Sequence, residues 1–111
     1  MPSLKFETSV TLSQAQEQAI SIEISTLAAQ LLNKPLAVIQ VRVKSGVTIA
    51  FGGEIAQDSA FLGIALIGEI NPDVKKELPA KFAELFAKYD INPKHIFLNY
   101  QETDPSAWGW L

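Results

Sequence analysis

Two stretches of this chain show the same order of strand, helix and strand patterns. In the first, residues 3–10 alternate apolar and polar side chains, a helical spacing follows, and residues 36–44 alternate again. In the second, an apolar strand pattern over residues 60–70 precedes a helical spacing and a strand pattern over residues 95–101. Alternation indicates strands, and the longer period indicates amphipathic helices. We therefore expect an internal duplication.

Capping residues, proline and glycine predict where the first helix begins and ends and where the short strand after the first repeat stops. Thr11 or Ser13 can accept a hydrogen bond from a free amide at the start of the helix. Asn33 and Pro35 end it, because the residue before a proline resists the helical conformation. A short strand over residues 47–51 is expected to stop at Gly-Gly, with residues 54–58 as a connecting loop.

The second helix has a capping asparagine and a proline in its first turn, Asn71-Pro72. Pro79 conflicts with the middle of this helix, because it lacks an amide hydrogen. We expect either a kink at Pro79 or a helix whose regular part begins near it. Asn92-Pro93 is expected to close the helix.

These units predict one domain over residues 1–111, with a pseudo-repeat of roughly residues 2–53 and 59–111. Its class is α/β, in the form of an α+β two-layer sandwich with duplicated β-α-β units. Right-handed crossovers place two helices on one face of a four-stranded sheet. Residues 60–70 are apolar on both sides, which one layer of helices cannot cover. We therefore expect self-association, with Trp108-Gly109-Trp110-Leu111 at an interface.

Composition argues against several classes of function. The net charge is −3 and the nine basic residues are scattered, which argues against nucleic acid as a partner. The chain has no cysteine, so disulfides, thiolate chemistry and cysteine metal sites are absent. It shows no signal-peptide pattern and no apolar run of about 18 residues, so no membrane partner is expected. The default expectation is a soluble cytoplasmic protein.

Pro2 becomes the N-terminal residue once Met1 is removed. Its nitrogen is then a secondary amine on a rigid ring, and it can carry a proton. An ordinary α-amino group has a pKa of about 7.7–8.0. An apolar pocket and a nearby cation would both lower that pKa, because both disfavour the charged form. Such an amine can act as a general base at neutral pH.

Six short segments occur in the order and at the spacing of one known family. They are Met1-Pro2, Asn33-Lys34-Pro35, Ala50-Phe51-Gly52-Gly53, Ile67-Gly68 with Ile70, Asn99-Tyr100 and Gly109-Trp110. Together they resemble the macrophage migration inhibitory factor family over nearly the whole chain. The resemblance implies a homotrimer in which three sheets form an internal barrel ringed by helices.

The resemblance also implies an activity, that of a phenylpyruvate tautomerase. Such an isomerase interconverts the keto and enol forms of small aromatic α-keto acids in pockets between subunits. By resemblance, Pro2 is the proton-shuttling base and Lys34 supplies the cation. The backbone amide of Ile67 binds the substrate, and Asn99 reaches in from the adjacent subunit.

The chemistry is consistent with these roles. Proton transfer between carbon and oxygen of an α-keto acid needs a base, a cation for the carboxylate, and donors for the developing enolate. Pro2, Lys34 and a backbone amide supply all three. An aromatic substrate also needs an apolar wall, for which Phe97 and Trp108 are candidates. The reaction needs no metal and no organic cofactor.

Three departures from the animal cytokines alter the expectation. Phe97 replaces a tyrosine, so a hydrogen bond worth about 1 kcal/mol is lost and we expect weaker activity or a shifted substrate preference. Ser59-Ala60-Phe61-Leu62 replaces Cys-x-x-Cys, so thiol oxidoreductase activity is not expected. The chain stops at Leu111, short of the animal C-terminal strand, which puts one pocket wall and part of the trimer contact in question. These departures suggest a divergent, microbial member.

Other readings stay open. One is a noncatalytic, trimeric, cytokine-like protein-binding module, with a protein receptor and secretion without a leader. Another is the same base acting on a halogenated or dienol acid. Each site residue also has an ordinary structural interpretation when it is taken singly. Lys34 could lie at a helix end and Ile67 in the core. Asn99 could satisfy a strand edge, and Trp108 could serve in packing. His95 shows no hydrolase spacing and is expected at the surface or at an interface.

Overall fold

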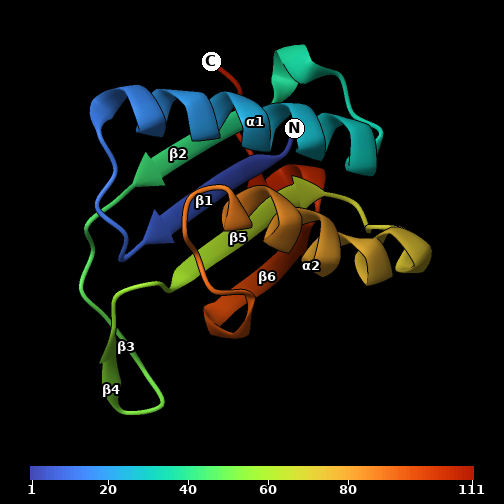
Figure 1. The fold of residues 1–111 in the computed structure, drawn as a ribbon. Coiled ribbons are helices and arrows are strands. Elements are labelled where there is room, and N and C mark those ends of the chain that lie inside the picture. Colours follow the sequence, from blue (N-terminus) through green and yellow to red (C-terminus); the bar gives the residue numbers. More distant parts are fainter.

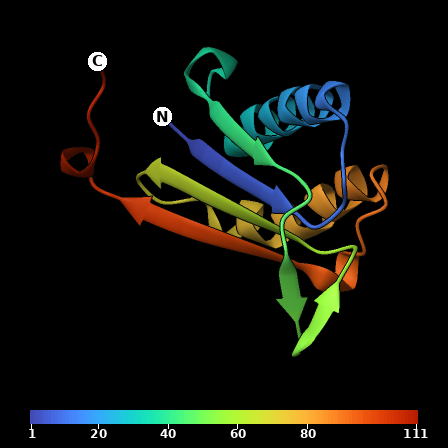
Figure 2. The ribbon, with the colours of Figure 1, turned by 90° about the vertical axis from the view of Figure 1, so that its left-hand side faces the viewer.

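The computed structural model describes residues 1–111 and has both helices on one side of a four-stranded sheet (Figures 1 and 2). The helices and strands are, in chain order, β1 (Ser3–Thr8), α1 (Gln14–Leu32), β2 (Gln40–Lys44), β3 (Ile49–Phe51), β4 (Glu54–Ala56), β5 (Ala60–Ile67), α2 (Pro72–Ala87) and β6 (Ile96–Thr103). Two short 3₁₀ helices lie between them, η1 (Leu36–Val38) and η2 (Pro93–His95), and a third, η3 (Pro105–Ala107), follows β6. No helix is long and apolar enough to cross a membrane.

The sheet consists of two β-α-β units set side by side. Its strand order is β2-β1-β5-β6. β1 pairs parallel with β2 across α1, and β5 pairs parallel with β6 across α2. The central pair, β1 and β5, is antiparallel. This arrangement confirms the predicted fold class, a two-layer sandwich built from duplicated units.

Local capping explains where the helices begin and end. Ser13, one of the two residues predicted to cap α1, accepts a hydrogen bond from the Gln16 amide at 3.1 Å and donates its own amide to the Gln16 side chain at 2.9 Å. Asn33 ends α1 in the left-handed conformation, with φ of 52°. Asn71 caps α2 by accepting a hydrogen bond from the Asp73 amide at 2.8 Å.

Helix α2 differs from its prediction at two points. It runs unbroken through Pro79, so the expectation that its regular part begins near this proline is wrong. Pro79 lacks the amide that would donate to the carbonyl of Lys75, and neither residue lies in the core, since Pro79 is exposed and Lys75 is half-buried. The helix ends at Ala87, before Asn92-Pro93, and these two residues instead open η2.

The structure corrects the strand predictions as well. Residues 36–38, predicted as the start of a strand, form η1, and β2 begins only at Gln40. β5 stops at Ile67 rather than at residue 70, and β6 extends to Thr103. Residues 54–56, predicted as loop, form β4, which pairs with β3. Gly52 and Gly53 both have positive φ, 63° and 82°, which is typical of a tight hairpin turn.

The core lies between the two helices and the face of the sheet that they cover. The rings of Phe6 on β1 and Phe86 on α2 lie 4.7 Å apart at its centre. Burial of one such side chain stabilises the fold by about 1.5–3 kcal/mol. The other fully buried apolar side chains are Leu4, Ile20, Ile24, Ala28, Leu62, Ile64, Leu78 and Phe82.

No helix covers the opposite face of the sheet (Figure 2). β1 presents alternate polar residues there, from Ser3 to Glu7, whereas β5 presents the apolar or small residues Phe61, Gly63, Ala65 and Ile67. The apolar part of the uncovered face is therefore a strip along β5. The hairpin of β3 and β4 projects from one end of the sheet (Figure 1).

Candidate active site

Pro2 is buried just before β1, in a cleft of about 380 Å³. The cleft is lined by Met1, residues 37–40 and residues 108–111, so both ends of the chain contribute to it. The carbonyl of Pro2 accepts a hydrogen bond from the amide of Gln40 at 3.1 Å, which ties the N-terminus to the start of β2. The structure thus brings Pro2 and Trp108, two of the predicted site residues, to one cleft.

Lys34 lines a hollow of about 290 Å³ that is separate from the Pro2 cleft. Asn33 turns the chain out of α1, and the Lys34 amide donates to the carbonyl of Ala29 at 3.1 Å. The Lys34 side chain is half-buried and shares the hollow with Leu66 and Glu69, near the end of β5. In the single chain, Lys34 is therefore close to β5 but is not part of the cleft that holds Pro2.

Ile67 is the last residue of β5 and lies at the same end of the sheet as Pro2. Ser3 pairs with Ala65, which places Pro2 near the end of β5. Ile67 itself pairs with Thr103, and the following amide, that of Gly68, donates to the Thr103 carbonyl at 2.9 Å.

Asn99 and Phe97 lie on β6, farther from Pro2. Asn99 is exposed and pairs with Gly63 in the middle of β5. Phe97 is 64% exposed and pairs with Phe61, at the end of the sheet opposite Pro2. The ring of Phe97 lies 5.3 Å from that of Phe51 on the projecting hairpin. The single chain therefore brings neither Asn99 nor Phe97 to the cleft.

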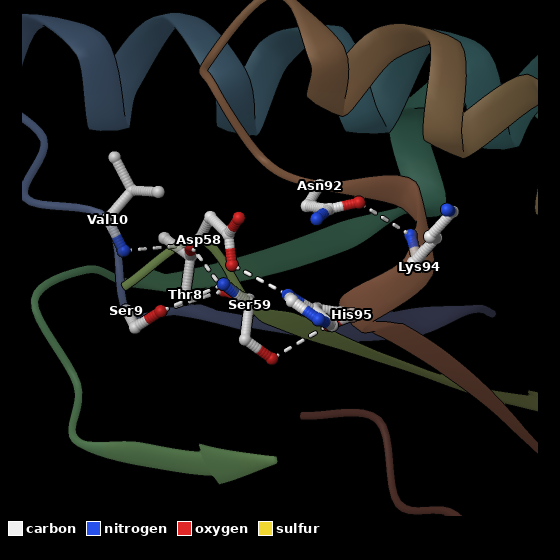
Figure 3. A network of polar contacts seen from close by, with 8 residues as sticks. All are labelled: Thr8, Ser9, Val10, Asp58, Ser59, Asn92, Lys94 and His95. Atoms are coloured by element: carbon white, nitrogen blue, oxygen red, sulfur yellow. Dashed lines mark hydrogen bonds and ion pairs between the residues drawn. The ribbon is translucent and has the colours of Figure 1, made fainter. Parts of the chain in front are cut away.

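A polar network that the sequence pattern did not reveal lies at that far end (Figure 3). Asp58 accepts a hydrogen bond from Nδ1 of His95 at 2.7 Å, and this bond lowers the pKa of the carboxyl below its usual 3.8. Ser59 is buried, and its hydroxyl donates to the backbone carbonyl of His95 at 2.7 Å rather than to the ring. The group therefore lacks the serine-to-imidazole contact of a hydrolase triad.

A hydrogen bond between Thr103 and Trp108 is a second contact that the sequence pattern did not reveal. The Thr103 hydroxyl accepts a hydrogen bond from the indole Nε1 of Trp108 at 2.6 Å. The two residues belong to a strand end and to the turn that follows, and no motif or period marks this kind of contact. No group of three or more His, Cys, Asp or Glu side chains is placed to hold a metal ion.

Comparison with known proteins supplies the family. The model of the macrophage migration inhibitory factor (MIF) family matches residues 1–111, which is the whole chain. The chain belongs to the MIF family. A search of curated proteins gives no significant match.

Solved MIF structures from microbes and parasites have the same fold as this MIF-family chain. MIF2 of Leishmania major is 24% identical, with a TM-score of 0.86 over 99% of this chain and 93% of that one. A MIF-like protein of Entamoeba histolytica is 22% identical, with a TM-score of 0.89 over 98% and 94%. A MIF homologue of Prochlorococcus marinus is 20% identical, with a TM-score of 0.86 over 98% and 95%. These likenesses confirm the two-layer fold expected from the strand and helix patterns of the sequence.

Proposed function

We propose that the protein is a keto-enol tautomerase that acts on phenylpyruvate-like α-keto acids and uses the N-terminal proline as its general base. The observation that carries this proposal is the position of Pro2, which is buried in a cleft that Trp108 also lines. Membership of the MIF family supports it, because the resemblance assigns proton transfer to this proline.

Removal of Met1 would convert the nitrogen of Pro2 from an amide into a secondary amine. Met1 itself lines the cleft, so its removal would also free space next to that nitrogen. The largely apolar lining of the cleft would lower the pKa of the amine, because apolar surroundings disfavour the charged form. A larger fraction of the amine would then be unprotonated and able to act as a base at neutral pH.

The reaction proposed is a proton transfer within the substrate. The amine takes a proton from the carbon next to the keto group, the C–H electrons form the carbon–carbon double bond, and the carbonyl oxygen takes up the negative charge. The protonated amine then returns its proton to that oxygen. Lys34 would pair with the substrate carboxylate, and the amide of Ile67 would donate to the substrate as charge develops.

Assembly into a homotrimer would complete this site. The uncovered apolar strip on β5 supports self-association, since a single chain leaves it exposed to water. Asn99 lies on the same uncovered face, away from the cleft of its own chain. We propose that Asn99 and Phe97 of one subunit reach the Pro2 cleft of its neighbour.

The test compares three forms of the protein in a phenylpyruvate enolisation assay, after mass spectrometry has established each N-terminus. They are the processed wild type, Pro2→Ala, and a chain with one alanine added before Pro2. The extended chain keeps every side chain but holds the Pro2 nitrogen in an amide. Because general base catalysis contributes about 10²- to 10⁴-fold, we expect a loss of that size in kcat/KM for the extended chain.

Circular dichroism and sedimentation serve as controls for fold and assembly. An extended chain with the kcat/KM of the processed wild type would contradict the proposal. A processed, assembled wild type that turns over neither phenylpyruvate nor halogenated and dienol acids would instead favour a noncatalytic protein-binding module.

A further inference from the structure

Trp108 lies outside the helices and strands, near the C-terminus. It follows η3, and residues 104–107 and 109–111 are exposed. Its backbone amide donates to the carbonyl of Pro105 at 3.2 Å, a contact within the same turn. Trp108 nevertheless lines the cleft that holds Pro2. Some contact outside the turn must therefore hold the indole in place.

The hydroxyl of Thr103 provides that contact. It accepts a hydrogen bond from Nε1 of Trp108 at 2.6 Å and donates one to the carbonyl of Leu66 at 2.7 Å. An indole N–H can only donate and a backbone carbonyl can only accept, so the direction of this chain of hydrogen bonds is fixed. A single hydroxyl thus links the Trp108 side chain to the backbone of β5.

The link ends at a residue next to the proposed substrate contact. Leu66 is fully within β5, and the residue after it, Ile67, pairs with Thr103 itself. Thr103 therefore holds the indole at a fixed place relative to Ile67, whose amide is proposed to bind the substrate. Bonds of this kind in series polarise one another and restrict the groups that they join.

We infer that Thr103 is a positioning residue that fixes Trp108 as the aromatic wall of the Pro2 cleft and so favours aromatic over small aliphatic α-keto acids. This inference rests on the proposed tautomerase function. The hydroxyl acts through Trp108 and touches neither the substrate nor the base. Loss of the Thr103 hydroxyl weakens the binding of an aromatic substrate ring and leaves proton transfer at Pro2 unchanged.

The principal test compares Thr103→Val, which keeps the shape and loses the hydroxyl, with Thr103→Ser, which keeps the hydroxyl. Loss of one hydrogen bond predicts a rise of about five- to tenfold in KM for phenylpyruvate with Thr103→Val. The kcat stays within about twofold, and so does KM for an aliphatic α-keto acid such as 2-oxobutanoate. Thr103→Ser restores the KM of the wild type. An unchanged KM in Thr103→Val, or an equal rise in Thr103→Ser, overturns the inference.

A second measurement follows the indole directly and does not depend on activity. The chain has two tryptophans, so Trp110→Phe leaves Trp108 as the only one. In that background, Thr103→Val is expected to shift the emission of Trp108 and to increase its quenching by acrylamide, whereas Thr103→Ser does neither. Identical spectra in all three proteins overturn the proposed anchor.

A further variant covers the case in which Thr103→Val folds poorly. Trp108→Phe leaves Thr103 unchanged, keeps an aromatic ring and removes the N–H donor of the same hydrogen bond, so by itself it should also raise KM for phenylpyruvate, and an unchanged KM overturns the inference. Where Thr103→Val folds, the variant that combines Thr103→Val with Trp108→Phe should raise KM no more than the larger of the two single changes. Additive effects overturn the inference. If the processed wild type does not turn over phenylpyruvate, the proposed function fails, and with it the substrate preference. The emission spectra alone then decide whether Thr103 holds Trp108.

Discussion

Phe97 and Asn99 are two residues apart on β6, so both side chains lie on the uncovered face of the sheet. If Asn99 reaches the cleft of a neighbouring subunit, Phe97 reaches it as well. The ring of Phe97 is 64% exposed in the single chain, which leaves it free to form an apolar wall there. It lacks the hydroxyl of the tyrosine that the animal cytokines carry.

A single added oxygen at this residue tests the assignment. Phe97→Tyr is expected to raise kcat/KM for phenylpyruvate by about fivefold, because the new hydrogen bond is worth about 1 kcal/mol. Phe97→Leu, which removes the ring, is expected to raise KM. Steady-state kinetics of the two variants provide the measurement. No change in either variant would place Phe97 outside the site.

Among the elements, α1 and α2 are joined by the carboxylate of Glu23. Lys88 and Tyr89, just after the end of α2, both donate hydrogen bonds to it. These bonds lower the pKa of Glu23 below its usual 4.5, with Lys88 contributing most. Burial, together with the bond to Glu23, raises the pKa of Tyr89 to about 12. The two helices are thus coupled by groups that change charge with pH.

The sign of the pH effect follows from the lowered pKa of Glu23. A carboxyl whose pKa is lower in the folded state adds stability above its unfolded value of 4.5, and that stability is lost as the pH falls through the folded pKa. We expect Glu23→Gln to lower the free energy of unfolding by about 1 kcal/mol at pH 7, since the group is partly exposed.

Urea unfolding of the wild type and of Glu23→Gln at a series of pH values measures this difference. It should shrink toward zero well below pH 4.5. Glu84→Gln is the matched control. Glu23 and Glu84 both line a groove between α1 and α2, and Glu84 is exposed. A difference that persists unchanged in acid would show that charge at Glu23 does not stabilise the fold.

For the molecule as a whole, the uncovered face of the sheet is the surface that a single chain leaves unpartnered. Ala65 lies near the middle of the apolar strip on β5, between Ser3 and Gln101 on the flanking strands. In the proposed trimer this face lies inside the assembly. Where the apolar strip packs against another chain, a charge placed on it would lose its contact with water, at a high cost in free energy.

Ala65→Lys is therefore expected to shift the protein from trimer to monomer and to remove tautomerase activity with it. Ala80→Lys makes the same chemical change on the exposed surface of α2 and should leave both unchanged. Sedimentation equilibrium gives the mass of each variant. A trimeric Ala65→Lys would mean that the chains do not assemble through this face.

The parts of the fold that depend on neighbouring residues could be predicted. Ser13 and Asn71 form hydrogen bonds within three residues, so a capping pattern is enough to find them. Strand β4 was missed because three residues are too few to show a period, although Gly52 and Gly53 before it are typical of a hairpin turn. The Asp58–His95 pair was missed because the two residues are 37 positions apart.

By itself, the sequence determined the two-layer fold and its family and made Pro2 the proposed base, because periodicity, capping and a short ordered set of motifs are properties of the chain alone. The tertiary structure decided which of the predicted residues meet. It brought Pro2 and Trp108 to one cleft and placed Lys34 in a separate hollow and Asn99 in the middle of β6. Only the folded chain could show the Thr103 link, because hydrogen bonds from one side chain to the next strand depend on how the strands pair.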